Sequence, residues 1–368
     1  GQIRATGVRY CPSIEDKLKK FPDKSTHHVF LEPEGLETDE YYPNGISTGL
    51  PEEVQIQMVH SIPGLEQARM IRPGYSVEHG VIPPTQTKLN LETKIIRGLF
   101  LAGQINGTTG YEEAAAQGIM AGINAALYTK DWEPFILRRD EAYIGVLLDD
   151  LTTKGTEEPY RMFTSRVEYR LLVREDNADN RMAAYAYKFG LMTQERFDSI
   201  QKKYETIQKE ISRLKSAKIF PAAEQGREIS RMLVEAGSTP LVQPVSLEDL
   251  LKRPQVWYVM LKNFGAGLSD EQAAEIEQVE YEVKYEGFIA RQRREVERFR
   301  HIENIRIPED LDYTAIPGLS IEIRQKLKLF SPNTLGQANR ISGVTPAAIS
   351  ILMVYLKKRS LDRRQKEV

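Results

Sequence analysis

The residue best suited to covalent chemistry is the single cysteine of the chain, Cys11. It precedes Ser13 and Asp16, whose spacing resembles a capping box and predicts a helix that begins at or just after Ser13. A thiol just ahead of a helix N-terminus, with Arg9 and Lys17 close in sequence, is expected to have a lowered pKa, and the thiolate is the reactive form. A single cysteine is also often a small buried hydrophobe, so the residue pattern leaves both interpretations open.

A glycine-rich turn offers a second kind of chemistry, the binding of an anionic cofactor. Residues 98–102 form an apolar run typical of a buried strand, residues 103–110 follow with the spacing G-x3-G-x2-G, and an alanine-rich helix is predicted for 112–127. Free N–H groups at a helix start favour negative charge, such as the charge of a reduced flavin. The spacing is not G-x-G-x-x-G, so a plain strand-to-helix connection is an equally good interpretation.

Arginines with aromatic neighbours indicate possible RNA contact in the second half of the chain. Arg166, Arg170 and Arg174 are spaced by four residues on a predicted helix, 162–174, with Arg161 one turn earlier. Arginine and tyrosine suit phosphate contact and base stacking. Solvated helix faces paired with glutamates explain the same pattern, and on pattern alone they are the favoured interpretation.

The composition excludes several function classes. The 368 residues carry a net charge of −2, with 41% hydrophobic and 28% charged residues, which is ordinary for a globular protein of roughly two or three domains. No P-loop, GxSxG or HExxH motif occurs, and the one cysteine and five histidines lack metal-ligand spacing, so we expect no metal site. No apolar run of about 18 residues occurs, so we expect no membrane association. The single cysteine fits a reducing, cytoplasmic location.

Turn signals separate an α/β first part, up to about residue 132, from a remainder that is almost wholly helical. A short strand is predicted at 28–31 and a helix at 52–61 in the first part. The helices predicted for the remainder are 136–150, 162–174, 176–189, 193–215, 226–236, 246–252, 270–303, 319–328, 334–340 and 345–359.

Several long segments resemble a single family. They include RYCPSIEDK at 9–17, GQINGTTGYEEAAAQG at 103–118, EPYRMFTSRVEYRL at 158–171 and RISGVTPAAISIL at 340–352. These segments are similar to the tRNA uridine 5-carboxymethylaminomethyl modification enzymes, the family also called glucose-inhibited division protein A. The resemblance runs from about residue 7 to residue 359, and its motifs are long and specific.

The resemblance implies a fold in three parts. Residues 1–132 would be the α/β remnant of a two-dinucleotide-binding-type FAD domain, namely its C-terminal portion. A mainly α-helical C-terminal region would follow, with a helical tRNA-binding domain at 133–300. A small helical subdomain at 301–368 would contact the partner or tRNA.

The resemblance also implies an activity. Such enzymes bind FAD, use NADH and, with a partner GTPase, add a carboxymethylaminomethyl or aminomethyl group to C5 of the wobble uridine of certain tRNAs. A folate one-carbon donor supplies the carbon, and glycine or ammonium supplies the nitrogen. We expect a homodimer.

The same resemblance assigns roles to single residues. Cys11 matches a residue proposed as catalytic. The FAD-binding residues expected at and around the position that matches Gln104 are Gly103, Gln104, Asn106, Gly107, Thr108 and Gly110. The NAD-binding residues expected in the matching segment 7–21 are Gly7, Arg9, Tyr10, Pro12, Ser13, Glu15, Asp16, Lys17 and Phe21. For tRNA the resemblance implicates only the helical region as a whole. The single tRNA-binding residues expected there follow from its rows of basic side chains and are Arg161, Arg166, Arg170, Arg174, Lys284, Arg291 and Arg294.

The chain departs from the family pattern in two respects: it has no glycine-rich βαβ fingerprint near its N-terminus and no second cysteine. We therefore expect it to be the C-terminal part of a longer enzyme and to be inactive alone. The alternative is a non-catalytic module that docks tRNA and the GTPase.

Overall fold

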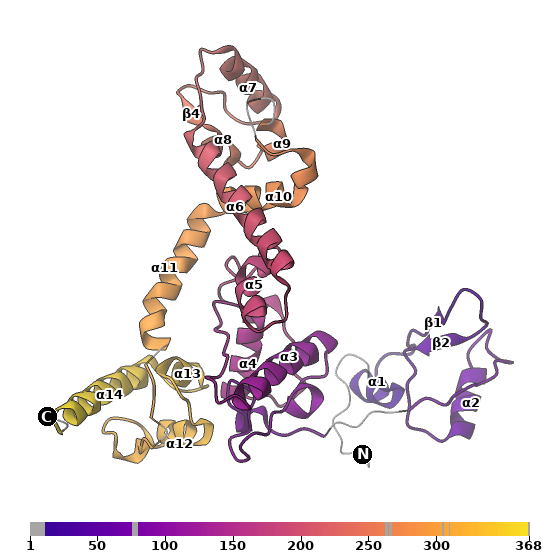
Figure 1. Cartoon of the computed structure of the whole chain (residues 1–368). Coiled ribbons are helices and arrows are strands. Elements are labelled where there is room, and N and C mark those ends of the chain that lie inside the picture. Colours follow the sequence, from indigo (N-terminus) through magenta and orange to yellow (C-terminus); the bar gives the residue numbers. More distant parts are fainter. Residues whose placement is uncertain are drawn as a thin grey trace. The chain divides into compact units, whose positions relative to one another are not determined.

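The computed structural model describes residues 12–75, 80–261, 264, 267–303, 305–308 and 310–366 (Figure 1). The chain divides into two compact units. The first consists of Gly1–Ile136 and Leu147–Met162, and the second of Leu137–Val146 and Phe163–Val368. In the part of the chain that the structure describes, no helix is both long and apolar enough to cross a membrane.

The first unit combines helices with one small sheet. Its only sheet among the described residues is the antiparallel pair β1 (Phe30–Pro33) and β2 (Tyr41–Asn44). Its other elements are α1 (Ile14–Lys20), α2 (Glu52–His60), η1 (Pro84–Gln86), η2 (Gly103–Asn106) and α3 (Tyr111–Tyr128). The predicted helices at 52–61 and 112–127 are therefore confirmed, whereas the described residues do not show the sheet of an FAD domain.

The prediction of a buried strand at 98–102 is wrong. Phe100 forms one isolated bridge with Glu92, and Leu99 is 40% exposed. An apolar run becomes a strand only when a neighbouring backbone pairs with it along its length, and a single bridge does not provide that pairing. The run instead leads as irregular chain into the glycine-rich turn.

The second unit is mainly helical, as predicted. Helix α4 (Tyr143–Thr153) begins in this unit and ends in the first. The unit's other helices are η3 (Thr164–Arg166), α5 (Ala178–Lys188), α6 (Gln194–Ser216), α7 (Glu224–Glu235), α8 (Leu247–Leu251), α9 (Tyr258–Leu261), η5 (Asp270–Gln272), α10 (Ala273–Lys284), α11 (Glu286–Glu303), η6 (Tyr313–Ala315), α12 (Ile321–Phe330), α13 (Leu335–Arg340) and α14 (Pro346–Lys366). A short antiparallel pair, β3 (Lys218–Ile219) and β4 (Val245–Ser246), lies among them.

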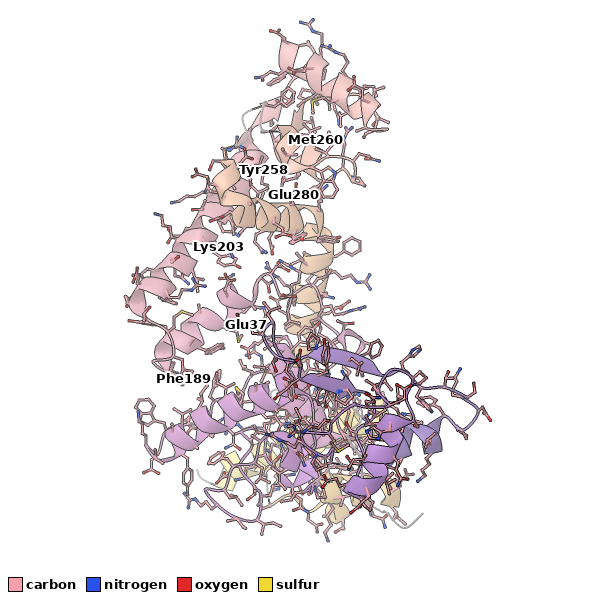
Figure 2. All side chains as sticks on the ribbon, turned by 90° about the vertical axis from the view of Figure 1, so that its right-hand side faces the viewer. Glu37, Phe189, Lys203, Tyr258, Met260 and Glu280 are labelled. Carbon is pink, nitrogen blue, oxygen red and sulfur yellow. The ribbon has the colours of Figure 1, made fainter. Side chains whose placement is uncertain are left out.

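Two clusters of buried side chains, which share no residue, provide the cores of this helical unit. The first cluster runs from Ile207 to Val283 and includes Leu250 and Tyr258, both fully buried. Tyr258 is labelled in Figure 2. The second runs from Ile307 to Leu356. Because each cluster draws on one continuous stretch of sequence, each stretch has a hydrophobic core of its own.

Three helix predictions are wrong in part. Segment 162–174 contains only the short turn η3, and segment 270–303 is interrupted at Tyr285, between α10 and α11. The helix predicted for 136–150 begins only at Tyr143. In segment 162–174 the Arg139 guanidinium donates to the Arg166 carbonyl at 3.3 Å. Tertiary contacts to this backbone replace the hydrogen bonds that a helix would supply.

Candidate functional site

The glycine-rich turn forms η2, directly before α3. Gly103 and Gly107 adopt left-handed backbone conformations, with φ of +77° and +84°. A Cβ at Gly107 would lie 2.7 Å from Pro84 Cγ, and a Cβ at Gly110 would collide with Glu113 Oε2. The positive φ and the close Pro84 contact therefore favour glycine at 107 independently of any ligand, whereas a Cβ at 110 would have to displace the end of the Glu113 side chain.

A buried amide network holds this turn in shape. Gln117 Oε1 accepts hydrogen bonds from the Gly103 N–H at 3.1 Å and from Asn106 Nδ2 at 3.0 Å, and Gln117 Nε2 donates to Thr108 Oγ1 at 3.0 Å. The Asn106, Thr108 and Gln117 residues are all 0% exposed. Two residues predicted to contact FAD, Asn106 and Thr108, thus direct their side chains into the protein.

Sequence reasoning missed Gln117, although the sequence carries a signal for it. Glu113, Gln117 and Asn124 lie at i, i+4 and i+11 on the buried face of α3, among alanines and glycines. Polar side chains on a buried helix face need hydrogen-bond partners, which points to an internal network. Asn124 supplies another example, because its side chain exchanges hydrogen bonds with the Phe135 backbone at 2.8 and 2.9 Å.

The surface of the turn fits a ligand such as FAD through a different set of groups. Gln104 is exposed, and the N-cap of α3, Gly110, makes no side-chain capping bond. Gly110 has no side chain, so the N-cap residue itself does not cap the first amides of α3. Glu112 and Glu113 in the first turn offset part of the helix dipole.

Arg161, predicted to contact tRNA, lies beside the same turn. Its Nε is 3.3 Å from Glu113 Oε1, which also accepts the Met162 N–H at 2.8 Å. The Tyr160 N–H donates to the Gly107 carbonyl at 2.8 Å. These contacts join segment 160–162 to the turn, so Arg161 neutralises a buried carboxylate there.

The segment predicted to bind NAD is only partly described. Gly7, Arg9, Tyr10 and the predicted catalytic Cys11 lie outside the described residues. The predicted helix start is confirmed, since Ser13 caps α1 by accepting the Asp16 N–H at 3.3 Å.

Two of the predicted NAD-binding side chains tie α1 to the loop after β2. Lys17 Nζ donates to the Gly45 carbonyl at 2.5 Å, and Glu15 accepts a hydrogen bond from the Thr48 hydroxyl. Burial raises the pKa of Glu15, but hydrogen bonds, led by that from Thr48, outweigh it and hold the pKa below its usual value. Pro12 is half-buried and Phe21 is exposed.

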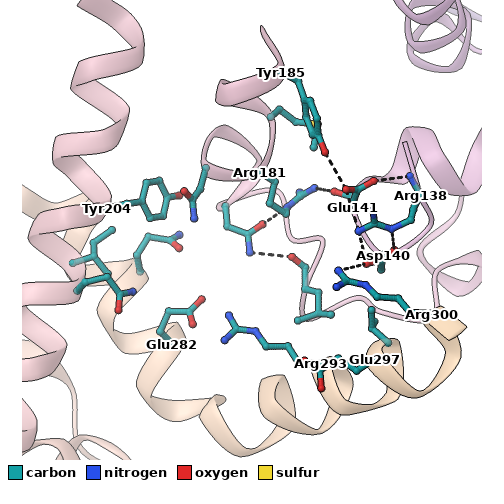
Figure 3. Close-up of a pocket in the computed structure, with 18 residues that line it drawn as sticks. Arg138, Asp140, Glu141, Arg181, Tyr185, Tyr204, Glu282, Arg293, Glu297 and Arg300 are labelled. Atoms are coloured by element: carbon teal, nitrogen blue, oxygen red, sulfur yellow. Dashed lines mark hydrogen bonds and ion pairs between the residues drawn. The ribbon is translucent and has the colours of Figure 1, made fainter. Parts of the chain in front are cut away.

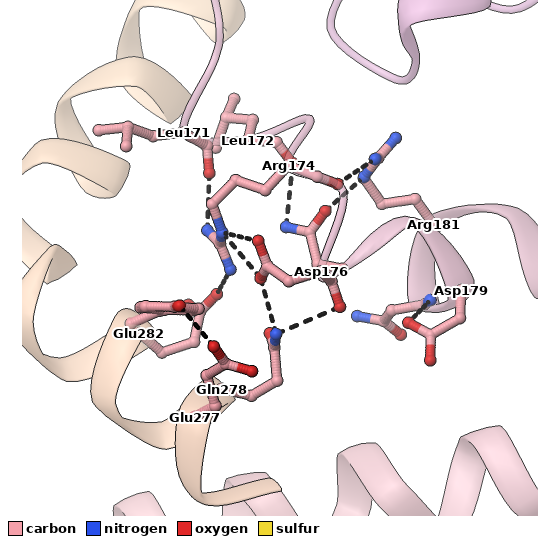
Figure 4. A network of polar contacts seen from close by, with 12 residues as sticks. Leu171, Leu172, Arg174, Asp176, Asp179, Arg181, Glu277, Gln278 and Glu282 are labelled. Carbon is pink, nitrogen blue, oxygen red and sulfur yellow. Dashed lines mark hydrogen bonds and ion pairs between the residues drawn. The ribbon is translucent and has the colours of Figure 1, made fainter. Parts of the chain in front are cut away.

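The predicted arginine row at 166–174 is wrong as a helix face. Arg166, Arg170 and Arg174 lie on irregular chain and a short 3-10 turn, so a spacing of four residues does not align them. The Arg174 side chain is only 13% exposed and pairs with Asp176 and Glu282, both at 3.0 Å (Figure 4). Arg170 remains exposed.

The three predicted tRNA-binding residues near α11 also differ in exposure. Lys284 Nζ donates to the Arg253 and Val256 carbonyls at 3.1 and 2.6 Å, and burial lowers its pKa. The Arg291 side chain is 74% exposed, although it pairs with Glu295 at 3.1 Å, and Arg294 is exposed. Arg291 and Arg294 are thus open to a partner, whereas Lys284 holds interior carbonyls.

A polar cavity of about 490 Å³ lies in the second unit, among segment 138–141 and helices α5, α6, α10 and α11 (Figure 3). Its lining contains equal numbers of arginine and carboxylate side chains. They are Arg138, Arg181, Arg293, Arg300, Asp140, Glu141, Glu282 and Glu297. Several of them pair with one another, as Arg138 does with Asp140 at 2.9 Å. The charges of these arginine and carboxylate side chains therefore balance in number.

Three family models match the chain. "Glucose inhibited division protein A" matches residues 1–133, the "tRNA modifying enzyme MnmG/GidA C-terminal helical domain" matches 194–293, and the corresponding "C-terminal helical bundle" matches 295–368. A relative from Thermodesulfovibrio yellowstonii, named tRNA uridine 5-carboxymethylaminomethyl modification enzyme MnmG, is 56% identical over 364 residues. That alignment covers 99% of this chain and 58% of the relative.

Solved structures show the same similarity. Two crystal forms of Aquifex aeolicus GidA, form II and form I, are 50% identical to this chain, with TM-scores of 0.78 and 0.76. They cover 95% and 97% of this chain, which in turn covers 55% of each. The chain thus spans a little over half the length of the relatives that it matches.

Proposed function

Because the chain belongs to the GidA/MnmG family, we propose that it forms part of an enzyme that modifies C5 of the wobble uridine in tRNA. The group added is carboxymethylaminomethyl or aminomethyl. The observation that carries this proposal is the 56% identity to an MnmG relative over 99% of the chain. We further propose that the enzyme acts in the cytoplasm as a homodimer, with NADH, a folate one-carbon donor, and glycine or ammonium.

We assign FAD to the glycine-rich turn. The exposed Gln104 amide and the uncapped N-terminus of α3 would hold it, and Gln117 keeps the backbone of the turn in place. When bound, the flavin supplies the redox chemistry and carries the one-carbon unit. NADH is assigned to segment 7–21, in which Asp16 carries a carboxylate and the Lys17 ammonium is held by the Gly45 carbonyl.

Cys11 is the proposed catalytic residue. Uridine C5 is a weak nucleophile until a group adds to C6 and raises the electron density at C5. A thiolate at Cys11 can form that S–C6 bond as the C5=C6 π electrons shift toward C5 and O4. Loss of the C5 proton after C5 has reacted would re-form the C5=C6 bond and release the thiolate. The thiol can alternatively move a proton near C5. Ser13 supports the first role, because it caps α1 and so fixes a helix N-terminus two residues after Cys11.

The exposed arginines and the C-terminal bundle are assigned to the macromolecular partners. Arg170, Arg291 and Arg294 are the predicted tRNA contacts with exposed side chains. The bundle at 301–368 is assigned to the GTPase partner or to tRNA. Its own hydrophobic core lets it present a surface without help from the preceding helices.

Mass spectrometry of modified wobble nucleosides tests the catalytic assignment. The complete enzyme in cells would carry either Cys11→Ser or Gln104→Ala. We expect Cys11→Ser to abolish the modified nucleoside while leaving flavin content unchanged, and Gln104→Ala to lower both. Unchanged nucleoside levels in the Cys11→Ser cells would remove this thiol from the mechanism.

A second candidate function is a non-catalytic module that docks tRNA and the GTPase. It is favoured by the absence of a glycine-rich βαβ fingerprint from this sequence. A visible absorption spectrum of the purified chain separates the two candidates. Flavin bound near one equivalent would exclude the docking module, whereas tRNA binding without flavin supports it.

A further inference from the structure

The chain passes between the two units at three places. It leaves the first unit after Ile136, returns at Leu147 within α4, and leaves it again after Met162. Within the first unit, buried polar side chains hold the backbone beside both exits to α3, and another links α4 to the glycine-rich turn. The places where the chain continues into the helical unit are therefore tied to the proposed flavin site.

Glu113 holds the backbone at the last of the three places. Its Oε1 accepts the Met162 N–H at 2.8 Å and lies 3.3 Å from Arg161 Nε. Glu113 is 5% exposed, and its Oε2 lies so close to the N-cap Gly110 that a Cβ there would collide with it. One carboxylate therefore joins the start of α3 to the residue after which the chain enters the helical unit.

Asn124 holds the backbone at the first place in the same manner. Its Oδ1 accepts the Phe135 N–H at 2.8 Å, and its Nδ2 donates to the Phe135 carbonyl at 2.9 Å. Phe135 is the residue before Ile136, and Asn124 is 2% exposed. Helix α3 thus anchors the chain at both of its exits from the first unit.

The remaining place lies inside α4, which continues across it. Asp150 on this helix accepts a hydrogen bond from the Tyr160 hydroxyl at 2.8 Å, and the Tyr160 N–H donates to the Gly107 carbonyl at 2.8 Å. Asp150 and Tyr160 are 2% and 3% exposed. The Tyr160 residue therefore links α4 to the glycine-rich turn.

These buried contacts favour a joint movement of α3 and the attached chain. A buried donor or acceptor that loses its partner costs about 1–3 kcal/mol. A displacement of Phe135 or Met162 away from α3 would break such bonds, whereas a displacement together with α3 keeps them. Since close-packed interiors change between discrete arrangements, a shift of the helical unit is expected to move α3 and the turn before it.

We propose that Glu113 and Asn124 are positioning residues that couple tRNA binding in the helical unit to the flavin turn. The inference rests on the proposed function, because it requires flavin and tRNA to bind where they are assigned. Coupling between two binding sites is reciprocal. A tRNA that changes the geometry of the turn must therefore bind the oxidised and the reduced flavoenzyme with different affinities.

The flavin midpoint potential of the complete enzyme, measured with and without tRNA, tests this coupling. The probe is unmodified tRNA from cells that lack the enzyme. We expect its affinities for the oxidised and the reduced enzyme to differ at least about fivefold, which corresponds to a shift of about 20 mV for a two-electron couple. An enzyme without bound flavin would overturn the proposed function, and the inference with it. Flavin and tRNA that bind without affecting each other would overturn the inference alone.

Substitutions in the first turn of α3 test the role of Glu113. Glu113→Ala removes the acceptor of the Met162 N–H and should reduce the affinity ratio to less than about twofold, with flavin still bound. Glu113→Gln should retain a larger ratio, because its amide oxygen still accepts this N–H. Glu112→Ala is the matched control, since Glu112 is the adjacent, exposed residue, and it should keep the wild-type ratio.

Asn124→Ala is the second variant, which keeps the test decisive if Glu113→Ala does not fold. It removes both hydrogen bonds to Phe135 and should also lower the affinity ratio. Two results would exclude the proposed coupling through α3. The first is a wild-type ratio in both Glu113→Ala and Asn124→Ala, and the second is an equal loss in Glu113→Ala and Glu112→Ala.

Discussion

Gln117 satisfies three groups of the glycine-rich turn from within α3, and each of them is buried. A buried donor or acceptor that loses its partner costs about 1–3 kcal/mol. The turn therefore depends on a residue fourteen positions after Gly103 in sequence. The Gln117 side chain therefore holds the backbone of the turn in its observed geometry. The proposed flavin contact through Gln104 depends on that geometry.

Replacement of Gln117 by leucine should lower the free energy of unfolding by about 2 kcal/mol or more, because the Gly103 N–H and the Asn106 amide would remain buried without this acceptor. Denaturant unfolding measures the change. Gln201→Leu, at an exposed site on α6, is the control and should shift stability by no more than about 0.5 kcal/mol. Equal effects of the two substitutions would contradict the role of the network.

Glu210 is a buried carboxylate in the core of the second unit. Its oxygens accept hydrogen bonds from Arg213 at 2.7 and 2.8 Å and from the Tyr258 hydroxyl at 2.5 Å. Burial raises the pKa of Glu210, but these hydrogen bonds, led by that from Arg213, outweigh it and hold the pKa below 4.5. Burial and the same contact raise the pKa of Tyr258 to about 12.

Acid should therefore destabilise this core through Glu210. A carboxyl group whose pKa is lowered in the folded state stabilises the fold above its unfolded value, near 4.5, and this contribution is lost as the pH falls through the folded value. We expect Glu210→Gln to be less stable than the wild type at pH 7, with the difference shrinking below pH 4.5. Urea unfolding across this range, with exposed Glu205→Gln as the control on the same helix, provides the measurement. A constant difference would contradict the argument.

At the scale of elements, irregular chain replaces the predicted helix over most of 162–174 and separates arginines that the sequence pattern had aligned. Arg174 turns inward, and its guanidinium joins Asp176 to Glu282 on α10. The Leu171 N–H in the same segment donates to the Gln292 side chain of α11 at 3.1 Å. Segment 162–174 thus makes contacts to both α10 and α11. Of its arginines, Arg170 is exposed and Arg174 is not.

Exposed and inward-facing arginines should respond differently to substitution. Replacing Arg170, Arg291 and Arg294 by alanine should weaken tRNA binding and reduce its salt slope by about one unit for each phosphate that is no longer neutralised. Arg174→Ala should instead lower the free energy of unfolding, since it leaves two partly buried carboxylates without their cation. Filter binding over a salt series, combined with unfolding curves, separates the two outcomes. An unchanged salt slope in the triple variant would show that these three arginines do not contact tRNA phosphates.

The two buried clusters of the helical unit are expected to open separately, because they share no side chain. Leu335 is fully buried in the C-terminal cluster. Leu335→Ala should destabilise that bundle by about 2–5 kcal/mol and speed amide exchange in α13 and α14. Exchange in α6 and α8 should stay at the wild-type rate, and Leu250→Ala should give the reverse pattern. Equal acceleration of both regions by either variant would indicate a single cooperative core.

At the scale of the whole molecule, the two units differ in how many hydrophobic side chains they bury. The helical unit has two hydrophobic clusters, whereas the segment 12–75 of the first unit has one buried hydrophobic side chain. Ligand binding stabilises a fold only when the binding site is formed. The proposed flavin site lies in the first unit, which contains this poorly buried segment.

We therefore expect FAD alone to leave the thermal midpoint of this chain unchanged. FAD added to a complete family enzyme should raise its midpoint, because a ligand that binds the folded state stabilises it. Thermal unfolding of this chain and of the complete enzyme, each with and without FAD, measures the effect. A rise with FAD alone would show that the described turn is sufficient for binding.

The amino-acid sequence by itself determined the family, the helical character of the second half and several helix ends. The helices that begin after Ser13 and Thr345 start where predicted, because a side-chain cap is a contact between residues three positions apart. The predictions that failed, a strand at 98–102 and a helix at 162–174, concern segments whose backbone partners are distant or missing.

The candidate site shows the same division. The glycine turn and the position of Gln104 within it were visible in the sequence, whereas the inward direction of Asn106, Arg174 and Lys284 was not. Arg174 meets a carboxylate that lies 108 positions away, and no local pattern encodes such a contact. Only the tertiary structure decided these orientations, because a buried polar group must point to whichever partner the folded chain brings within hydrogen-bond distance.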